Sequence, residues 1–326
     1  MEEEKNMTTR IMGTGSCLPQ TVVTNDDLAK IMDTSDEWIR TRTGIRERRL
    51  AKEETTSFMC CEAALRALED AGMSGEEIEL IIVGTLTGDY VTPSTACEVQ
   101  AKIGAKRAVA FDVNAACSGF LFALHIAHAY LQAGIYQNAL ILGAETLSKI
   151  MDWSDRSTCV LFGDGAGAAV LKRDERGVLS FDMGCDGAKG HVLSCKGRPN
   201  NNPLVSHPTE PEFVHMDGQE VYKFAVGRVP KSIQSVLAQS GMDAGDISWF
   251  VLHQANIRIL QSVAKRLGVS EEKFPISLDH CGNISAASVP ILLDEMNQKG
   301  MLKRGDKIVL SGFGGGLSWG SVLLEW

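Results

Sequence analysis

The sequence has no apolar run long enough to cross a bilayer, which takes about 20 residues in a helix. Its start, Met1–Asn6, is acidic and lacks the basic and apolar regions of a signal peptide. Basic residues are not in excess, and the net charge of −9 argues against nucleic acid as the main partner. The nine cysteines include no Cys-x-x-Cys pair, so we expect no disulfide framework, and a reducing cytoplasm fits best.

Signals for a metal or a nucleotide cofactor are also missing. One set of residues has spacings that match no common zinc pattern: Cys185, His191, Cys195, His207 and His215. The glycine-rich run Gly163–Gly167 is not followed by the helix that a dinucleotide-binding loop needs, because Ala168–Leu171 reads as a strand. We therefore predict neither a bound metal nor a cofactor.

The chain does have the apolar residues for a large core, since 44% of its 326 residues are hydrophobic. It also contains a faint internal duplication. Asp70–Val83 matches Gln239–Leu252 at an offset of 169 residues, and Ala139–Gly143 falls on Ile308–Gly312 at the same offset. The longer pair reads as a helix, a Gly-Met turn and a buried strand.

Two matches at one offset predict two α/β halves of similar topology, because the repeat of a solenoid is far shorter. Apolar strands between helices predict mainly parallel sheets that are covered on both faces. A charged stretch at Arg173–Gly177 breaks the pattern, so we place the halves at residues 1–176 and 177–326.

Cys117 is the candidate nucleophile. Ala108–Val113 before it reads as a short strand, and Phe120–Ala133 after it reads as a buried helix. The positive end of that helix is expected to lower the pKa of the thiol and favour the thiolate. A packed core cysteine is the alternative, but the small residues on either side leave room for a ligand beside the sulfur.

Two further segments offer partners for a reactive thiol. His253 ends the apolar run Trp249–Leu252, so we expect it at the end of a strand. Asn283 lies in a glycine-containing loop before a helix start rich in small residues. Each has an ordinary alternative, a structural histidine and a Gly-Asn turn, but together Cys117, His253 and Asn283 indicate a site assembled across the two halves.

With these three residues in this order, the chain closely resembles β-ketoacyl-acyl-carrier-protein synthase III from about Ile11 to the C-terminus. The motifs that carry the resemblance are Asp33–Ile39, Thr41–Arg46, His253–Asn256, Gly282–Ser288 and Phe313–Gly316. The resemblance implies the thiolase fold, in which the two halves form αβαβα layers. The first half would carry the cysteine and the second the histidine and asparagine.

The resemblance also implies a ping-pong Claisen condensation that starts type II fatty-acid synthesis. Cys117 would take the acyl group from an acyl-coenzyme A primer. Malonyl-acyl-carrier protein would then lose carbon dioxide and attack the acyl-enzyme to give 3-oxoacyl-acyl-carrier protein. His253 and Asn283 would donate hydrogen bonds to the enolate, and the backbone N–H groups of Cys117 and Gly315 would form the oxyanion hole.

Further residues are assigned by the same resemblance. Those implied for coenzyme A are Thr34, Trp38, Arg42, Arg156, Asn256 and Phe313. Those implied for the acyl channel are Thr92, Leu147 and Phe162. Members restricted to short primers tend to carry a bulky aromatic at the position of Thr92, so this smaller residue predicts acceptance of longer or branched chains. The alternative is that Tyr90 or a loop from the second subunit fills the space.

The acidic carrier protein needs a basic docking patch on this acidic chain. Arg258 and Lys265 are seven residues apart on an expected helix, with Arg266 adjacent, and Lys223 lies on another helix. The resemblance further implies a homodimer. The alternatives are a condensing enzyme of secondary metabolism with another primer or acceptor, and a silent protein that only binds acyl-coenzyme A or carrier protein.

Overall fold

The structure is a computed structural model that describes residues 7–205 and 212–326. Its core contains two sheets, and the order of strands in the first is β1-β7-β6-β4-β5. These strands span Thr8–Cys17, Asp164–Asp174, Asn138–Thr146, Leu80–Gly84 and Val109–Val113. The second sheet has the order β11-β12-β13-β8, with strands Trp249–Leu252, Lys307–Gly314, Ser318–Glu325 and Val178–Cys185.

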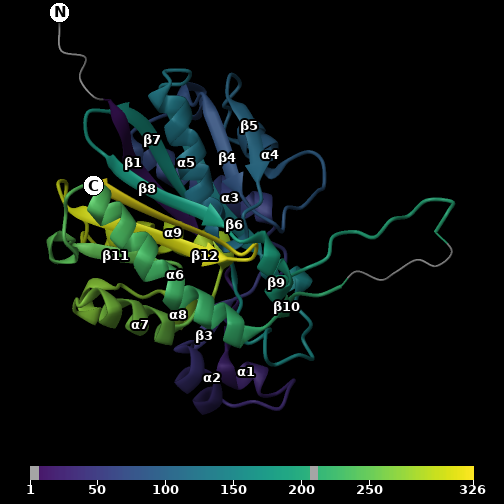
Figure 1. The fold of residues 1–326 in the computed structure, drawn as a ribbon. Helices are drawn as coiled ribbons and strands as arrows, with labels where there is room; N and C mark the ends of the chain where they lie inside the picture. The colour runs from purple at the N-terminus through teal and green to yellow at the C-terminus, as the bar shows by residue number, and fades with distance from the viewer. Residues whose placement is uncertain (1–6, 206–211) are drawn as a thin grey trace, which may run out of the picture.

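Helices cover both sheets on both faces (Figure 1). Helices α5 (Gly119–Gln132) and α9 (Ser288–Gln298) lie between the sheets, where their apolar side chains share one core with strands of both. Helices α3 and α4 pack on the outer face of the first sheet, and α6 and α7 on that of the second. Their bounds are Thr56–Ala71, Thr95–Lys102, Gly218–Gln239 and Ile257–Leu267. The expected αβαβα layering is confirmed.

The expectation of mainly parallel sheets is wrong. Of the seven strand pairings in the two sheets, three are parallel: β4 with β5, β4 with β6, and β11 with β12. A parallel pair needs a long crossover, whereas an antiparallel pair can be joined by a short turn, as β12 and β13 are. Strands buried on both faces read as apolar runs in either orientation, so their pattern did not reveal the direction.

The internal duplication is visible in the order of the strands. The parallel pair β4 and β6 occupies the place in the first sheet that β11 and β12 occupy in the second. At the same offset of 169 residues, the short 3-10 helix Ala116–Ser118 before α5 corresponds to Ser285–Ala287 before α9. Both begin with a non-glycine residue at positive φ, 45° at Ala116 and 44° at Ser285. The two halves therefore share the sharp turn before their central helix as well as their strands.

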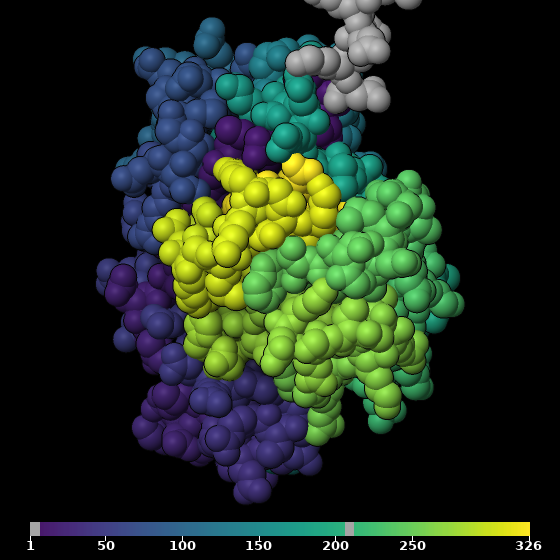
Figure 2. Space-filling model, turned by 90° about the vertical axis from the view of Figure 1, so that its left-hand side faces the viewer, coloured from purple at the N-terminus to yellow at the C-terminus, as the bar shows by residue number. Residues whose placement is uncertain are grey.

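Smaller elements surround the two central sheets at one end. They are β2 (Val22–Thr24), α1 (Asn25–Leu28), α2 (Asp36–Thr43), β3 (Glu47–Arg49), β9 (Leu193–Ser194), β10 (His215–Met216) and α8 (Leu278–Cys281). Figure 2 shows the segment around α2 pressed against the C-terminal half, where α2 contacts α7. Among the described residues, no helix is long and apolar enough to cross a membrane.

Candidate active site

Cys117, His253 and Asn283 line one cavity of about 480 Å³. The cysteine lies just before α5, whereas His253 follows β11 and Asn283 follows α8. Six further predicted residues line the same cavity: Trp38, Arg42, Phe162, Asn256, Arg258 and Phe313. The wall is mostly apolar and carries a smaller number of polar side chains, Cys117, His253 and Asn283 among them, which is the usual composition of a site for an organic ligand.

The thiol of Cys117 is held in a tight turn between β5 and α5. The positive φ of Ala116 turns the chain sharply before the cysteine, which is only 8% exposed. Gly314 at the end of β12 packs directly against it. A Cβ at this glycine would lie 2.9 Å from the Cys117 Sγ and 2.7 Å from its Cβ, so only glycine fits here.

The expected low pKa of the Cys117 thiol is wrong for the protein alone. Burial raises it to about 11, and the buried Glu145 carboxyl adds to the shift. Hydrogen bonds from Ser285 and from the N–H groups of Cys117 and Gly315 act against it but do not overcome it. The thiol is therefore protonated at neutral pH and must lose its proton as it reacts.

His253 follows the last residue of β11 and is 1% exposed. Its backbone N–H donates to the Ser311 carbonyl (2.8 Å), and its ring meets the Phe313 ring edge-on at 5.2 Å between centroids. Burial lowers the pKa of the imidazole to about 3, so the ring is neutral at physiological pH. Its Nδ1 atom has no hydrogen-bond partner among the described residues.

Asn283 is fixed by its backbone and by its side-chain oxygen. Its N–H donates to the Leu161 carbonyl (2.8 Å), and its own carbonyl accepts from the Gly163 N–H (3.0 Å). The Oδ1 atom accepts from the backbone N–H of Ser285 (2.9 Å). Because the amide oxygen is held in this way, the Nδ2 hydrogens are the part of the side chain left to serve a ligand.

Sequence reasoning missed Glu145, a carboxyl with no exposed surface next to the reactive residues. Its Oε1 accepts from the Ser285 hydroxyl (3.1 Å), and its Oε2 accepts from the Thr87 hydroxyl and from the Leu86 N–H (3.2 Å). Burial raises the pKa of Glu145 to about 7 in spite of these donors. Glu145 lies at the end of an apolar run in β6. The signal available in the sequence was a charged residue in a strand that is otherwise expected to be buried.

The raised pKa of Glu145 predicts a pH-dependent stability. The folded protein keeps this proton up to about pH 7 and the unfolded chain loses it near 4.5, so stability falls as the pH rises through this window. The loss is about 3 kcal/mol. Glu145→Gln should remove this fall, as measured by urea unfolding at pH 5 and pH 8, because glutamine does not titrate. Equal pH dependence in both proteins would contradict the assignment.

Two of the residues predicted for coenzyme A, Arg42 and Arg156, lie over the ring of a third, Trp38. The guanidinium carbons of Arg42 and Arg156 lie 4.6 Å and 5.3 Å from the centroid of its ring. Asn256 caps α7 and donates through Nδ2 to the Arg42 carbonyl (3.0 Å). The hydroxyl oxygen of Thr34 is buried without a hydrogen-bond partner among the described residues. Thr34 and Arg156 do not line the cavity itself.

The residues predicted for docking are exposed. Arg258, Lys265 and Arg266 lie on α7, the helix that follows His253, and the Arg258 Nη2 donates to the Thr41 carbonyl of α2 (2.9 Å). Lys223 lies on α6 with its side chain 68% exposed and paired with Glu220. Of these four, Arg258 is the one that also lines the cavity.

Of the three residues predicted for the acyl channel, one lines the cavity. Phe162 lines the cavity and pairs with Asn283 in an isolated β-bridge. Leu147 is buried in the same apolar cluster as Phe162 but does not line the cavity. Thr92 is exposed and lies outside the cavity of its own chain, so it cannot close the channel from within that chain.

Comparisons with known proteins identify what this arrangement resembles. The family described as 3-Oxoacyl-[acyl-carrier-protein (ACP)] synthase III matches residues 111–187, and the family of its C-terminal part matches residues 237–326. The beta-ketoacyl-[acyl-carrier-protein] synthase III of Clostridium acetobutylicum is 52% identical over 97% of this chain and 98% of its own. The relative from Clostridium tetani is 48% identical over 99% of both.

Solved structures give the same picture. The 3-oxoacyl-[acyl-carrier-protein] synthase III of Aquifex aeolicus superposes with a TM-score of 0.92 at 46% identity, covering 98% of this chain and 100% of the other. A priming β-ketosynthase from the R1128 polyketide pathway gives a TM-score of 0.91 at 36% identity, covering 100% and 98%. Both structures share the fold of this chain, and its sequence is more similar to the Aquifex aeolicus enzyme than to the polyketide enzyme.

Proposed function

The chain belongs to the β-ketoacyl-acyl-carrier-protein synthase III family, and on this premise we propose the role of each residue at its site. The protein is an acyltransferase, the condensing enzyme that starts type II fatty-acid synthesis. It joins an acyl-coenzyme A primer to malonyl-acyl-carrier protein. The observation that best supports these roles is that Cys117, His253 and Asn283 line the same cavity.

In the first half-reaction the Cys117 sulfur attacks the thioester carbon of the acyl-coenzyme A. The N–H groups of Cys117 and Gly315 stabilise the oxyanion that forms, a role supported by their effect on the pKa of the same thiol. The new bond joins the Cys117 sulfur to the acyl carbon, and the bond to the coenzyme A sulfur breaks. The proton lost by Cys117 leaves on the coenzyme A thiol, so no standing thiolate is required.

In the second half-reaction malonyl-acyl-carrier protein loses carbon dioxide, and the electrons of the broken bond form an enolate. His253 and Asn283 donate hydrogen bonds to the enolate oxygen. A neutral His253 suits this role when its proton is on Nε2. The buried Nδ1, which has no hydrogen-bond partner among the described residues, then carries no proton, so no N–H group is left unpaired there. The enolate carbon attacks the acyl carbon, and the bond from that carbon to the Cys117 sulfur breaks. The thiolate that leaves takes one proton from solvent and becomes a thiol again.

A two-stage experiment tests this sequence of steps. The protein is mixed with acyl-coenzyme A, and the intact mass should rise by one acyl group while an equal amount of free coenzyme A appears. Addition of malonyl-acyl-carrier protein should remove the adduct and produce 3-oxoacyl-acyl-carrier protein. A stable adduct that is never passed on would contradict the condensation, and no adduct with any primer would contradict the acyl transfer.

For the carrier protein we propose docking on the exposed basic residues of α7. The electrostatic attraction of these residues for an acidic partner should set its binding. Arg258→Glu should raise the KM for malonyl-acyl-carrier protein about tenfold, roughly 1.4 kcal/mol, with a smaller effect on acylation. Lys265→Glu tests the patch without touching Thr41, and Lys106→Glu is a charge-matched control on the opposite outer layer. Equal losses in all three variants would contradict docking at α7.

We also propose a homodimer that covers exposed apolar residues of each protomer. Tyr90 and Val91 are 62% and 94% exposed, and Leu204 is 92% exposed. Exposed apolar side chains in such number are typical of an interface. In this arrangement Thr92, next to Val91, reaches the acyl channel of the partner rather than its own.

The position of Thr92 predicts an effect on chain length. Thr92→Phe should shorten the longest acyl chain that is transferred, because the larger ring fills the end of the channel. The measurement is the intact mass after incubation with acyl-coenzyme A of graded chain length. Thr92→Val is the control of equal size and should keep the profile of the unchanged protein. An unchanged profile in Thr92→Phe would contradict a role in the channel.

Three broader assignments complete the proposal. Residues 1–176 and 177–326 are the duplicated halves, supported by the strands of the first sheet ending at Asp174 and those of the second starting at Val178. The reaction needs no cofactor, since each step above uses only side chains, backbone N–H groups and the two substrates. The enzyme acts in the cytoplasm, which keeps its nine free cysteines reduced.

A further inference from the structure

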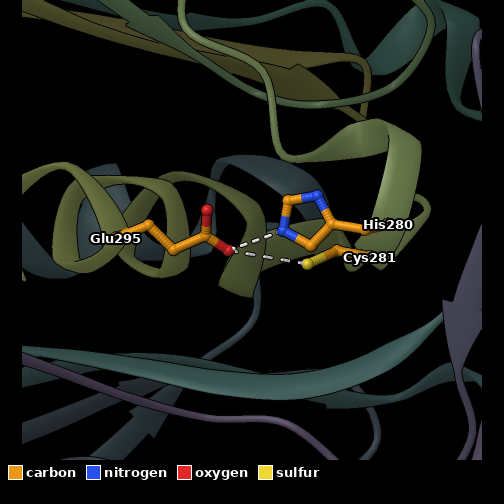
Figure 3. Close-up of side chains that lie close together, drawn as sticks. All are labelled: His280, Cys281 and Glu295. Carbon is orange, nitrogen blue, oxygen red and sulfur yellow. Dashed lines mark hydrogen bonds and ion pairs between the residues drawn. The ribbon is translucent and has the colours of Figure 1, made fainter. Parts of the chain in front are cut away.

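His280, Cys281 and Glu295 form a cluster of metal-ligating side chains outside the cavity described above (Figure 3). His280 and Cys281 end α8, and Glu295 points toward them from α9. The His280 Nε2 lies 2.9 Å and the Cys281 Sγ 3.9 Å from the same Glu295 oxygen, Oε1. All three ligand atoms lie within 4.8 Å of one another.

This combination of atoms fits zinc. One imidazole nitrogen, one sulfur and one carboxylate oxygen are the three ligand types that Zn²⁺ accepts, with a water as the fourth ligand. Tetrahedral bonds of 2.0–2.3 Å place neighbouring ligand atoms about 3.3–3.6 Å apart. The observed separations lie on both sides of this value, so small side-chain rotations would admit the ion. Ions that prefer only oxygen ligands, such as Mg²⁺ and Ca²⁺, are disfavoured by the sulfur and nitrogen.

Two of the three ligands are also held by hydrogen bonds to residues outside the cluster. The His280 Nδ1 is held by Asp279 at 2.8 Å, which leaves Nε2 directed at the cluster. A carboxylate on the far nitrogen of a histidine is the usual support for a zinc ligand. The second Glu295 oxygen, Oε2, is held by Lys299 at 3.1 Å, which leaves Oε1 facing His280 and Cys281. Each outer partner therefore orients one ligand.

An ion can also reach the cluster. Cys281 is buried at 2% exposure, but the side chains of His280 and Glu295 are 35% and 18% exposed. The site thus has a buried thiol at its base and two partly exposed ligands at its mouth.

We propose that these three residues bind one Zn²⁺ ion through His280 Nε2, Cys281 Sγ and Glu295 Oε1. Binding replaces two protons, the thiol proton of Cys281 and the Nε2 proton that His280 donates to Glu295, and both pass to solvent. The charges of thiolate and carboxylate then balance that of the ion. The ion joins the end of α8 to α9 on either side of the segment that carries Asn283. Zn²⁺ therefore stabilises the position of that segment, which is a structural role separate from acyl transfer.

Cobalt tests the proposal in the full-length protein, because a Co²⁺–thiolate bond gives a charge-transfer band in the near ultraviolet. The unchanged protein should show this band at one equivalent of Co²⁺, and Zn²⁺ should abolish it by competition. Cys281→Ser should lose the band, and Glu295→Gln should weaken Zn²⁺ binding at least tenfold. Asp279→Asn should weaken it roughly 10- to 100-fold through the supporting hydrogen bond.

Two controls separate this site from the other cysteines. Cys117→Ser removes the reactive thiol and Cys195→Ser removes an exposed one, and both should keep the band. Thermal unfolding gives a second measurement, since Zn²⁺ should raise the Tm of the unchanged protein but not that of Cys281→Ser. A missing band, or a band that survives in Cys281→Ser, would overturn the site.

Discussion

Cys117→Ala should abolish acyl transfer, with no acyl adduct after incubation with acyl-coenzyme A. Condensation should fall by about 10⁶-fold, as when the nucleophile of a covalent enzyme is removed. The decarboxylation of malonyl-acyl-carrier protein should survive, because we propose that it depends on the donors His253 and Asn283 and not on the sulfur. The measurements are the intact mass of the protein, the product of condensation and the release of carbon dioxide.

Cys159→Ala is the matched control for this prediction. Burial raises the pKa of the Cys159 thiol to about 11, as it does for Cys117, but Cys159 packs in an apolar cluster and does not line the cavity. This variant should lose some stability and keep the adduct. An adduct of unchanged yield in Cys117→Ala would show that another residue is the nucleophile.

The placement of Cys117 and His253 was predictable because each follows an apolar strand, whereas Asn283 follows the short helix α8. Local patterns mark these positions: β5 before Cys117, β11 before His253, and a glycine before Asn283. The duplication was predictable because buried strands of the two halves kept similar residues at a fixed offset. The sharp turn that the duplication places before each central helix was not predictable. The positive φ values of Ala116 and Ser285 give no signal in a run of small residues.

The protonation of the site could not be predicted in the same way. The expected low pKa of Cys117 followed from a helix end, whose effect is local and visible in the sequence. Its raised pKa follows from burial and from Glu145, which lies 28 residues further along the chain and reaches the site only in the folded protein. The position of Thr92 outside the cavity of its own chain was hidden for a similar reason, because it depends on tertiary structure.

Asn283→Ala should separate the two half-reactions. Acylation of Cys117 should stay within a few-fold of the unchanged protein, because the oxyanion hole proposed for that step consists of backbone N–H groups. Decarboxylation and condensation should fall by 10²–10³-fold, about 3 kcal/mol, which is the usual cost of losing one donor to a developing oxyanion. The rates of adduct formation and of carbon dioxide release measure the two steps separately.

Asn283→Asp sharpens the test, since it keeps the oxygen that accepts from the Ser285 N–H and replaces only the donating amide. A carboxylate facing the enolate would repel it, so this variant should be at least as slow in decarboxylation as Asn283→Ala. If Asn283→Asp instead kept most of the activity, the role of Asn283 would be to hold the turn at Ser285, and the enolate would be stabilised by His253 without it. Loss of acylation in both variants would show that Asn283 shapes the whole cavity, and its assignment to the second half-reaction would be wrong.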